Sequence, residues 1–298
     1  MQVIKNNVLT FSKNNKPIAH AKPGELLIFE TMDCFANQFR SEEQLVHDLD
    51  LSKANPAAGP VHIDGAEPGD TVVVDVLDIE VEKAGFACTI EGTGPLSDQF
   101  QVRTRMIPVK NGVAYFNDVT WLVSPMIGVI GTAPDGEEVP CGMAGNHGGN
   151  LDSRLIKKGA RVYLPVRVEG ALLQMGDLHA SMGDGEVCGT GIEIPGEVLV
   201  RVGLIKKFEL NWPVTETFDR WYVNTTGPNY DHCLREAGRE ICRLMKPIYG
   251  WDATDIQIYL SLQGDVEVNQ AVRPFFVDMM TFRLGIPKRP EKSPLIQI

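Results

Sequence analysis

Apolar residues in the first two thirds of the chain follow alternating or short continuous runs, which predict a structure made mainly of β-strands. Four of these runs begin after a similar turn, in which a dipeptide ending in glycine precedes an extended apolar stretch. Where the dipeptide is Pro-Gly it suits a type II turn, because proline fixes φ and glycine accepts φ > 0. We interpret the recurrence as common turn chemistry that starts four strands. The four segments are residues 22–35, 67–80, 157–168 and 194–205.

Two further places predict how strands are connected. Asn111-Gly112 lies between two uneven alternating runs and is a strong signal for a two-residue β-hairpin. Residues 157–175 read as a strand, a turn and a second strand. We expect an antiparallel pair there, which would bring the chain around His147 close to the chain around His179.

Helical spacing replaces strand alternation in the last third of the chain. Apolar residues recur at helical intervals between residues 229 and 250, and Gly250 marks the end of this predicted helix. A second helix is predicted to begin at Thr254, because Gln257 three residues later fits a capping box. A return strand or loop is expected over residues 265–284.

Together these patterns predict a chain in two parts. Residues 1–210 are expected to form a mainly β body that carries most of any functional site. Residues 211–298 are expected to form an α+β part, in which two helices pack on a sheet.

The composition is that of a soluble globular protein. The 298 residues are 43% hydrophobic and 22% charged, and the net charge is −11. A nucleic-acid partner is not expected, because such proteins present a basic face. A membrane partner is not expected either, since no apolar run approaches the length of a membrane span and the first residues lack the apolar stretch of a signal peptide. Six scattered cysteines without a CxxC motif indicate reduced thiols and a cytoplasmic location.

Residues 141–186 hold the densest group of chemically active side chains, including His147 and His179. Glycines between them would let the backbone approach a ligand closely. Imidazole and carboxylate are the ligands that Zn²⁺ and similar divalent ions use in proteins. Gly, Asp and Asn also form ordinary turns, so the prediction of a metal site depends on the two halves of this region acting together. The other polar residues here are Asn146, Asn150, Asp152, Asp177, Asp184 and Glu186.

Four polar residues outside this region lie in or beside predicted strands. Asp33 lies where a strand meets a loop, so it could face a pocket or cap the polar segment that follows. His62 could be a ligand, although a half-exposed strand position is the commoner case for such a residue. His20 precedes a turn and is interpreted as a surface residue. Glu193 alternates with two isoleucines and is expected to face away from the core.

Several long motifs are rich in unusual residues. They are NPAAGPVHIDGAEPGD (55–70), EGTGPLSDQ (91–99), GNHGGNLD (145–152) and the stretch from YLPVRVEG to CGTGIE (163–193). With these motifs the chain resembles the acetamidase/formamidase family, from about residue 22 through the two predicted helices. The resemblance implies a hydrolase for the carbon–nitrogen bond of small linear amides, with a β-sandwich or jelly-roll body, an added α+β part and a divalent metal. It also implies a homo-oligomer, expected to be a dimer.

A mechanism follows as a hypothesis. Glu186 or Asp184 is expected to act as the base on the attacking water and to return the proton to the leaving ammonia. The backbone N–H groups of Gly148 and Gly149, or the side chain of Asn150, are expected to stabilise the oxyanion. The expected ligands of the ion, zinc or alternatively calcium, are His179, Asp33 and one or more of His147, Asp152 and Asp177.

Two other interpretations stay open on the sequence. The protein could be a thiol-dependent amidase whose nucleophile is Cys141 or Cys188, which flank the predicted site. The acidic surroundings disfavour this, because a reactive cysteine needs an electropositive setting. The protein could instead be a non-catalytic β-sandwich that binds small ligands and contains structural Ca²⁺, since Asp, Asn and Gly loops also suit hard cations.

Overall fold

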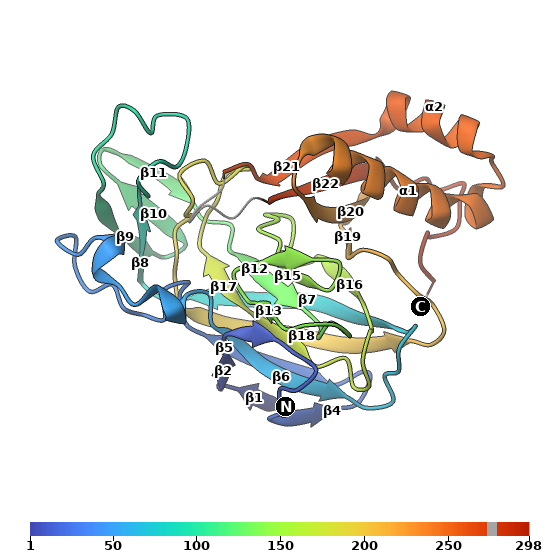
Figure 1. Ribbon diagram of the computed structural model, residues 1–298, viewed down its shortest axis with the longest axis horizontal. Coiled ribbons are helices and arrows are strands. Elements are labelled where there is room, and N and C mark those ends of the chain that lie inside the picture. The colour runs from blue at the N-terminus through green and yellow to red at the C-terminus, as the bar shows by residue number, and fades with distance from the viewer. Residues whose placement is uncertain (273–278, 298) are drawn as a thin grey trace.

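The computed structural model describes residues 1–272 and 279–297. Two large β-sheets form the body, and two helices lie beside one end of the larger sheet (Figure 1). The larger sheet has nine strands, which in spatial order are β1 (Gln2–Ile4), β5 (Leu26–Thr31), β18 (Gly196–Ile205), β7 (Thr71–Val81), β16 (Arg161–Pro165), β19 (Val214–Glu216), β20 (Arg220–Gly227), β22 (Met280–Pro287) and β21 (Asp265–Gln270).

The second large sheet has seven strands and faces the first. In spatial order they are β14 (Ala144–Gly145), β15 (Gly148–Asn150), β12 (Met126–Gly131), β17 (Leu173–His179), β6 (Ala57–Ile63) and β2 (Asn7–Val8), while β4 (Ala19–Ala21) pairs with β6. Smaller elements complete the body. They are the sheet β11 (Val119–Leu122), β10 (Val113–Phe116), β9 (Thr104–Lys110) and β8 (Ala84–Cys88), the pair β13 (Val139–Pro140) and β3 (Thr10–Phe11), and the 3₁₀ turns η1 (Val46–Asp48) and η2 (Leu51–Lys53).

The two large sheets enclose the main hydrophobic core between them. Leu27 and Phe29 of β5 enter this core from the nine-stranded sheet, and Val61 of β6 and Leu173 of β17 enter it from the opposite sheet. All four side chains are fully buried. Two sheets packed face to face over such a core form a β-sandwich. The predicted mainly β fold with a C-terminal α+β part is therefore confirmed.

The turn signals correctly located several strands. Gly24 and Gly69 follow proline and have φ of 97° and 91°, as a type II turn requires, and they precede β5 and β7. The four strands that follow the recurring turn are neighbours in one sheet, in the order β5, β18, β7 and β16. Asn111 and Gly112 connect β9 to β10 with φ of 52° and 74°, which confirms the predicted hairpin.

The expected antiparallel pair within residues 157–175 is wrong. The two strands exist as β16 and β17, but β16 pairs with β7 and β19 in the larger sheet, whereas β17 pairs with β12 and β6 in the other. The connection passes through Ala171 and Leu172, whose φ values are 58° and 59°, and carries the chain from one sheet to the other. Local sequence could not separate these alternatives, because a strand buried in a sandwich has the same apolar pattern in either sheet.

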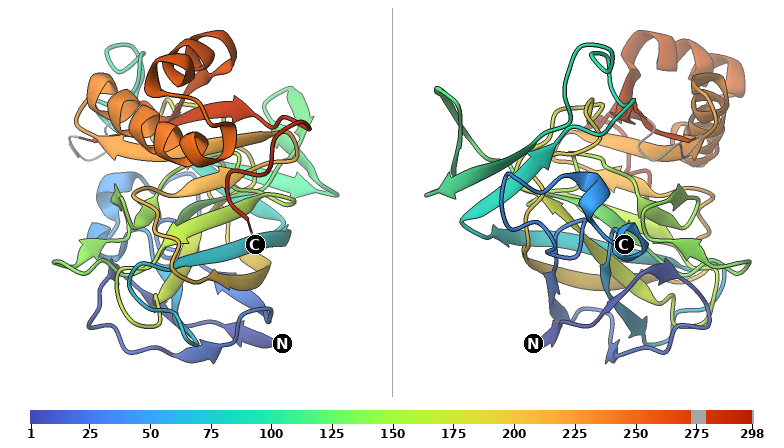
Figure 2. Two further views of the ribbon diagram at one scale, coloured as in Figure 1. Left: turned by 90° about the vertical axis from the view of Figure 1, so that its right-hand side faces the viewer. Right: turned by 60° about the vertical axis from the view of Figure 1, so that its left-hand side comes forward.

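Both predicted helices are present and lie on the strands at the C-terminal end of the larger sheet (Figure 2). Helix α1 (Tyr230–Tyr249) buries an apolar face that includes Ala237 and Ile241, and it ends at Gly250 with φ of 70°. Helix α2 (Ala253–Gln263) is capped by Asp252, whose side chain accepts a hydrogen bond from the backbone N–H of Asp255. The predicted capping box at Thr254 is therefore wrong by two residues.

The larger sheet runs without interruption across the division expected near residue 210, because β16 pairs with β19. Residues from β20, β22 and α1 share a second hydrophobic core with Val73 of β7 and Tyr163 of β16. The predicted return segment contains β21 and β22, and residues 273–278 between them lie outside the described residues. Neither α1 nor α2 is long and apolar enough to cross a bilayer.

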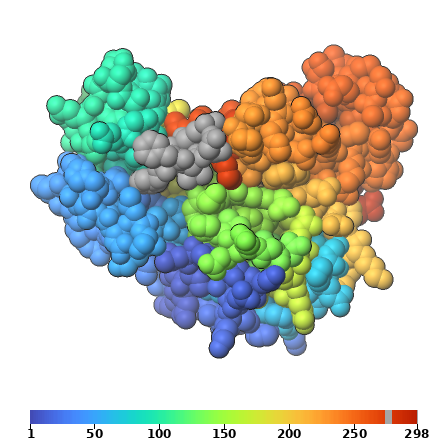
Figure 3. All heavy atoms as spheres, in the orientation of Figure 1, coloured from blue at the N-terminus to red at the C-terminus, as the bar shows by residue number. Residues whose placement is uncertain are grey.

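On the face shown in Figure 3, the region of β8 to β11 and the C-terminal helices rise on two sides of the body. The small four-stranded sheet projects from the sandwich, as Figure 2 also shows. Elements far apart in the sequence therefore surround the middle of this face.

Candidate active site

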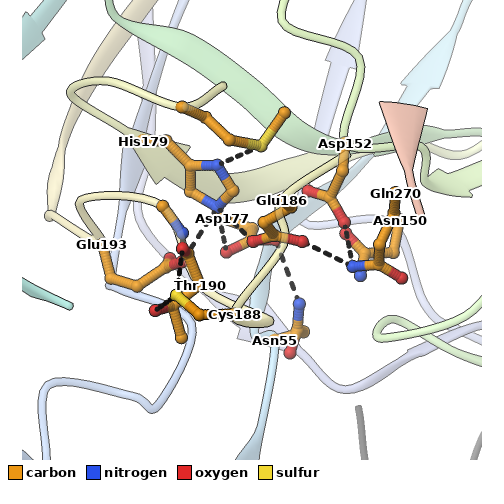
Figure 4. A network of polar contacts seen from close by, with 12 residues as sticks. Asn55, Asn150, Asp152, Asp177, His179, Glu186, Cys188, Thr190, Glu193 and Gln270 are labelled. Atoms are coloured by element: carbon orange, nitrogen blue, oxygen red, sulfur yellow. Dashed lines mark hydrogen bonds and ion pairs between the residues drawn. The ribbon is translucent and has the colours of Figure 1, made fainter. Parts of the chain in front are cut away.

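Buried acidic side chains converge where β15, β17 and β21 end and β6 begins (Figure 4). His179 is the last residue of β17, and Asp177 lies two positions before it. Asp152 follows β15, and Glu186 and Glu193 come from the chain that leaves β17. Each of these five side chains is buried.

His179 is the centre of the group. Its Nε2 atom lies 3.1 Å from Oε1 of Glu193, 3.5 Å from Oδ1 of Asp177 and 3.9 Å from Oε1 of Glu186. Its other ring nitrogen, Nδ1, lies 3.3 Å from the sulfur of Met182. With its proton on Nδ1, the ring would leave the Nε2 lone pair free for a cation held among the carboxylates.

Two amide side chains hold the acids in place. Nε2 of Gln270, at the end of β21, donates to Oδ2 of Asp152 at 2.9 Å and to Oε2 of Glu186 at 2.6 Å. Nδ2 of Asn55 donates to Oδ2 of Asp177 at 3.1 Å. Gln270 belongs to the C-terminal part of the chain, so both parts contribute to the site.

The backbone at three of the acids has a rare conformation. Asp152, Asp177 and Glu186 have φ values of 45°, 55° and 43°. Residues other than glycine seldom adopt positive φ, and each such residue costs on the order of 1–3 kcal/mol. Three strained carboxylate residues in one group indicate that the fold holds these side chains for a function.

Two glycines leave room for the site. A Cβ atom on Gly128 of β12 would lie 2.6 Å from Oδ1 of Asp152 and 2.7 Å from Oδ2 of Asp177. A Cβ atom on Gly191 would lie 2.9 Å from the ring of His179. Any larger side chain at either position would push a site residue out of place.

Burial and charge shift the pKa values of the group. Burial raises the pKa of Asp152 well above its usual value, and the charge of Glu186 raises it further. Burial raises the pKa of Glu186, and also that of Glu193 to about 8, although His179 opposes both shifts. Burial lowers the pKa of His179, but Glu193 and Asp177 more than offset this, and the pKa is well above normal. One imidazolium cannot balance so many carboxylates, so the group must bind protons or a cation.

The geometry of the group fits a divalent ion. Ligand atoms of Asp152, His179 and Glu186 lie within 4.8 Å of one another, as do those of Cys34, Asp177 and Glu193. Ligands about 2.0 Å from a tetrahedral Zn²⁺ would lie roughly 3.3 Å apart. The distances around Nε2 of His179, 3.1 to 3.9 Å, bracket that spacing.

The hydrogen bonding of the group also leaves room for an ion. Among the described atoms, three buried carboxylate oxygens of the group have no hydrogen-bond partner, which would be costly without an ion or water. They are Oδ1 of Asp152, Oδ1 of Asp177 and Oε2 of Glu193.

A cavity of about 440 Å³ opens onto these acids. Asp152, Asp177, Glu186 and Glu193 form its polar side. The rest of the described wall is largely apolar and comes from distant segments. It includes Leu9, Phe35, Ala54, Pro140 and Met143. The cavity can therefore present several carboxylates to a small, partly apolar molecule, and the imidazole of His179 lies behind them.

The structure does not bring His147 into this group. His147 lies next to Gly148, which pairs with Gly131 of β12, whereas His179 pairs with Met126 of the same strand. Gly131 and Met126 are five residues apart, so the two histidines are separated by roughly 17 Å along β12. The ring of His147 packs edge-on against Phe11, and burial lowers its pKa to about 4. The expectation that the chain around His147 lies close to the chain around His179 is wrong, because the hairpin expected to join them does not form.

Two predicted acids have other partners. Oδ1 of Asp33 accepts hydrogen bonds from the backbone N–H groups of Phe35 and Asn37, so this buried carboxylate caps the turn that follows it. Asp184 pairs with Arg154 at 3.0 Å and with Arg283 at 2.8 Å. Of the two acids considered as the base, the structure places Glu186 in the cavity wall and directs Asp184 toward arginines.

Of the two candidate oxyanion donors, Asn150 borders the cavity. Its Nδ2 atom lies 3.4 Å from the carbonyl oxygen of Gly142, a long hydrogen bond that a ligand could replace. Gly149 lies inside the sheet between Ile130 and Ala144, and it is not among the described residues of the cavity wall.

The sequence interpretation missed Glu193, Asn55 and Gln270. The expectation that Glu193 faces outward is wrong, since Glu193 is 1% exposed. Its backbone forms β-bridges to both Phe86 and His179, and Ile192 and Ile194 on either side of it are also buried. Asn55 had a turn signal that could have marked it. Gln270 had no local signal, because its partners Glu186 and Asp152 precede it in the sequence by 84 and 118 positions.

The cysteines do not resemble a thiol nucleophile. Cys141 is fully buried, and burial raises its pKa to about 12, far from the range of a reactive thiolate. The thiol of Cys188 donates to the backbone oxygen of Thr190. Cys34 borders the cavity, but burial raises its pKa well above the usual value.

The chain is similar to several characterised proteins. A formamidase of Methylophilus methylotrophus is 32% identical over 251 residues, which cover 63% of this chain and 61% of that protein. This match therefore spans about three fifths of the relative's length. An acetamidase of Mycolicibacterium smegmatis is 29% identical over 266 residues, with 63% of each chain covered.

Solved structures and a family model agree with these relatives. An acetamidase from Bacillus halodurans superposes with a TM-score of 0.91 and 36% identity, covering 96% of this chain and 97% of that one. A protein described as a predicted acetamidase/formamidase from Thermoanaerobacter tengcongensis gives 0.92 and 38%, covering 96% and 95%. The model of one family matches residues 10–141 and 139–242, most of the chain. The resemblance seen in the motifs is thus confirmed, and the chain belongs to the acetamidase/formamidase family.

Proposed function

We propose that this protein is a metal-dependent amidase that hydrolyses small linear amides, such as formamide or acetamide, to a carboxylate and ammonia. The observation that carries the proposal is the buried group of carboxylates around Nε2 of His179, which borders a cavity. The names of the relatives support the substrate class, because one is a formamidase and two are acetamidases.

We assign the ion to His179, Asp177, Asp152 and Glu193. Glu186 is left out because its Oε1 lies 3.9 Å from Nε2 of His179, farther than the oxygens of Glu193 and Asp177 at 3.1 and 3.5 Å. These residues supply one nitrogen and several oxygens, a donor set that suits Zn²⁺ or a similar transition ion better than Ca²⁺, which prefers oxygen alone. Three of these carboxylates have an oxygen without a hydrogen-bond partner in the described part of the chain. This assignment removes Asp33 and His147 from the ligands expected on the sequence and adds Glu193.

Glu186 is left to handle protons. Oε2 of Glu186 is held by Gln270, and Oε1 lies 3.9 Å from Nε2 of His179, at the cavity wall. When bound, the ion lowers the pKa of a water molecule and polarises the amide carbonyl. Glu186 removes a proton as the water oxygen bonds to carbon, and it returns that proton to nitrogen as the carbon–nitrogen bond breaks. Asn150, whose Nδ2 has a weak partner, can donate to the carbonyl oxygen.

The cavity favours a short substrate with a small apolar group. Leu51, Ala54 and Met143 border the same space as the acids and would contact the carbon side of the amide. The polar side would receive its carbonyl and nitrogen. A non-catalytic ligand-binding module would leave the strained backbone at Asp152, Asp177 and Glu186 without a role.

Metal analysis combined with an ammonia-release assay tests the proposal. The purified protein is expected to contain a stoichiometric divalent ion and to release ammonia from formamide or acetamide. A strong chelator should remove both the ion and the activity, and added Zn²⁺ should restore them. Undiminished hydrolysis by metal-free protein would refute the role of the ion. Inactivation by iodoacetamide that chelation does not mimic would favour the thiol alternative.

A further inference from the structure

Three residues on the outer face of the seven-stranded sheet form a second group of metal-type ligands. They are His20 in β4, His62 in β6 and Asp64 just after β6. One ligand atom from each lies within 4.8 Å of the others. The group shares no residue with the acids around His179.

The strand register fixes this arrangement. Strands β4 and β6 are parallel, and His20 is paired directly with His62, so both side chains leave the same face of the sheet. Asp64 lies two positions beyond His62, and its backbone N–H continues the ladder by donating to Ala21. The neighbours of His62 on the other face, Val61 and Ile63, are buried in the main core. The group therefore rests on rigid strands.

The distances suit ligands of a common ion better than a hydrogen-bond network. Oδ1 of Asp64 lies 3.4 Å from Nδ1 of His20 and 3.5 Å from Nδ1 of His62, longer than typical hydrogen bonds. Ligands of a tetrahedral zinc ion lie roughly 3.3 Å apart. Nδ1 of His62 is buried and has no hydrogen-bond partner among the described atoms. The two imidazole rings have centroids 4.5 Å apart.

The ring of His62 is also held in place from below. Gly170, with φ of 73°, lies so close to this ring that a Cβ atom there would overlap it. The side chain of His62 is 22% exposed, whereas those of Asp64 and His20 are 41% and 62% exposed. An ion could thus reach the group from solvent and keep water in its remaining positions.

We propose that His20, His62 and Asp64 form a second site, which binds a divalent transition ion such as Zn²⁺. Two imidazoles and one carboxylate are suitable ligands for such ions, whereas Mg²⁺ and Ca²⁺ prefer oxygen ligands. The bound ion would join β4 to β6 and so stabilise the outer strand of the sheet. The proposal does not depend on the activity assigned to the buried site.

Zinc titration of the purified protein tests this site. Equilibrium dialysis against Zn²⁺ followed by mass-spectrometric metal analysis should show one more equivalent in the wild type than in His20→Asn or Asp64→Asn. Cobalt absorption should show the same loss. Histidine 20 is largely exposed, so His20→Asn is expected to fold even if a variant of the more buried His62 does not. Amide hydrolysis should be unchanged in His20→Asn.

His47→Asn is the matched control. His47 is an exposed histidine 3.7 Å from Asp48, but it has no second imidazole beside it in the described structure, so its loss should not change zinc content. Equal zinc content in wild type, His20→Asn and Asp64→Asn would overturn the proposal. Loss of zinc in His20→Asn together with retained activity would support it, whatever ion the buried site contains.

Discussion

The two groups of imidazole and carboxylate differ in nearly every physical respect. Around His179, four carboxylates are buried, three of them lie on strained backbone, and amide side chains fix their orientation. Around His62, a single carboxylate and two imidazoles stand on regular strands and are partly exposed to solvent. The first group joins residues of β17 to loop residues that meet them only in the fold, whereas the second follows from the register of two strands.

The difference shows how burial changes what a group of metal-type ligands requires. Burial excludes water and strengthens every electrostatic interaction, but it also makes unbalanced charge costly. The buried group therefore needs protons or a cation to balance its charge, and strained backbone holds its acids beside a cavity. The proposed surface group would bind an ion without burial or strained backbone.

Replacing a buried ligand should have the largest effect. Asp177→Asn keeps the shape of the side chain but removes its charge, so we expect loss of the ion and a fall in kcat/KM of roughly 10³-fold or more. Metal analysis and ammonia release measure both. Asp118→Asn, in the exposed turn after β10, is the control and should behave as wild type. Full metal content and activity in Asp177→Asn would remove this residue from the ligands.

The proposed base should separate catalysis from metal binding. Glu186→Gln is expected to retain the ion while kcat falls about 10²- to 10⁴-fold, because the proton acceptor is lost. Parallel metal analysis makes the distinction. If Glu186→Gln loses the ion as Asp177→Asn does, Glu186 is a ligand, and the base must be sought elsewhere in the cavity wall.

Removing the amide that joins two acids should have a smaller effect. Gln270→Ala leaves Asp152 and Glu186 without a shared donor, and groups that orient metal ligands are typically worth about 10- to 100-fold in affinity or activity. Gln99→Ala, at an exposed position, is the control. An unchanged kcat in Gln270→Ala would mean that the two acids are held without it.

Filling the space beside the acids should weaken the site and the fold together. Gly128→Ala would place a methyl group 2.6 Å from Asp152 and is expected to lower the free energy of unfolding by about 1–3 kcal/mol. Gly136→Ala is the matched control for Gly128→Ala, because a Cβ atom at Gly136 would meet no atom within 4 Å apart from those of its chain neighbours. Denaturant unfolding of both variants gives the comparison, and equal stability would show that the acids can move aside.

The surface site should give the smallest effect. Without added metal, His20→Asn should change the free energy of unfolding by no more than about 0.5 kcal/mol, as for most surface substitutions. With Zn²⁺, the wild type should gain thermal stability through its surface site, and His20→Asn should gain less. Thermal unfolding with and without Zn²⁺ measures this difference, which would be absent if the ion did not join β4 to β6.

Much of the fold could be predicted from local sequence. Pro-Gly turns, Asn111-Gly112 and the helical spacing before Gly250 each gave a correct element, because each depends on backbone conformations that neighbouring residues impose. The family motifs and the density of acids near His179 indicated the region from which most of the buried acids come. The expected homodimer and cytoplasmic location stay predictions.

Local sequence predicted many of the strands, both helices, the class of fold and the region that supplies most of the buried acids. The contacts between distant residues became known only from the folded chain. There β16 and β17 belong to different sheets, so His147 lies apart from His179. Glu193 and Gln270 contact the residues of the buried acidic group. The physical reason is that strand and turn preferences act over a few residues, whereas the choice of sheet partner depends on packing between segments distant in the chain.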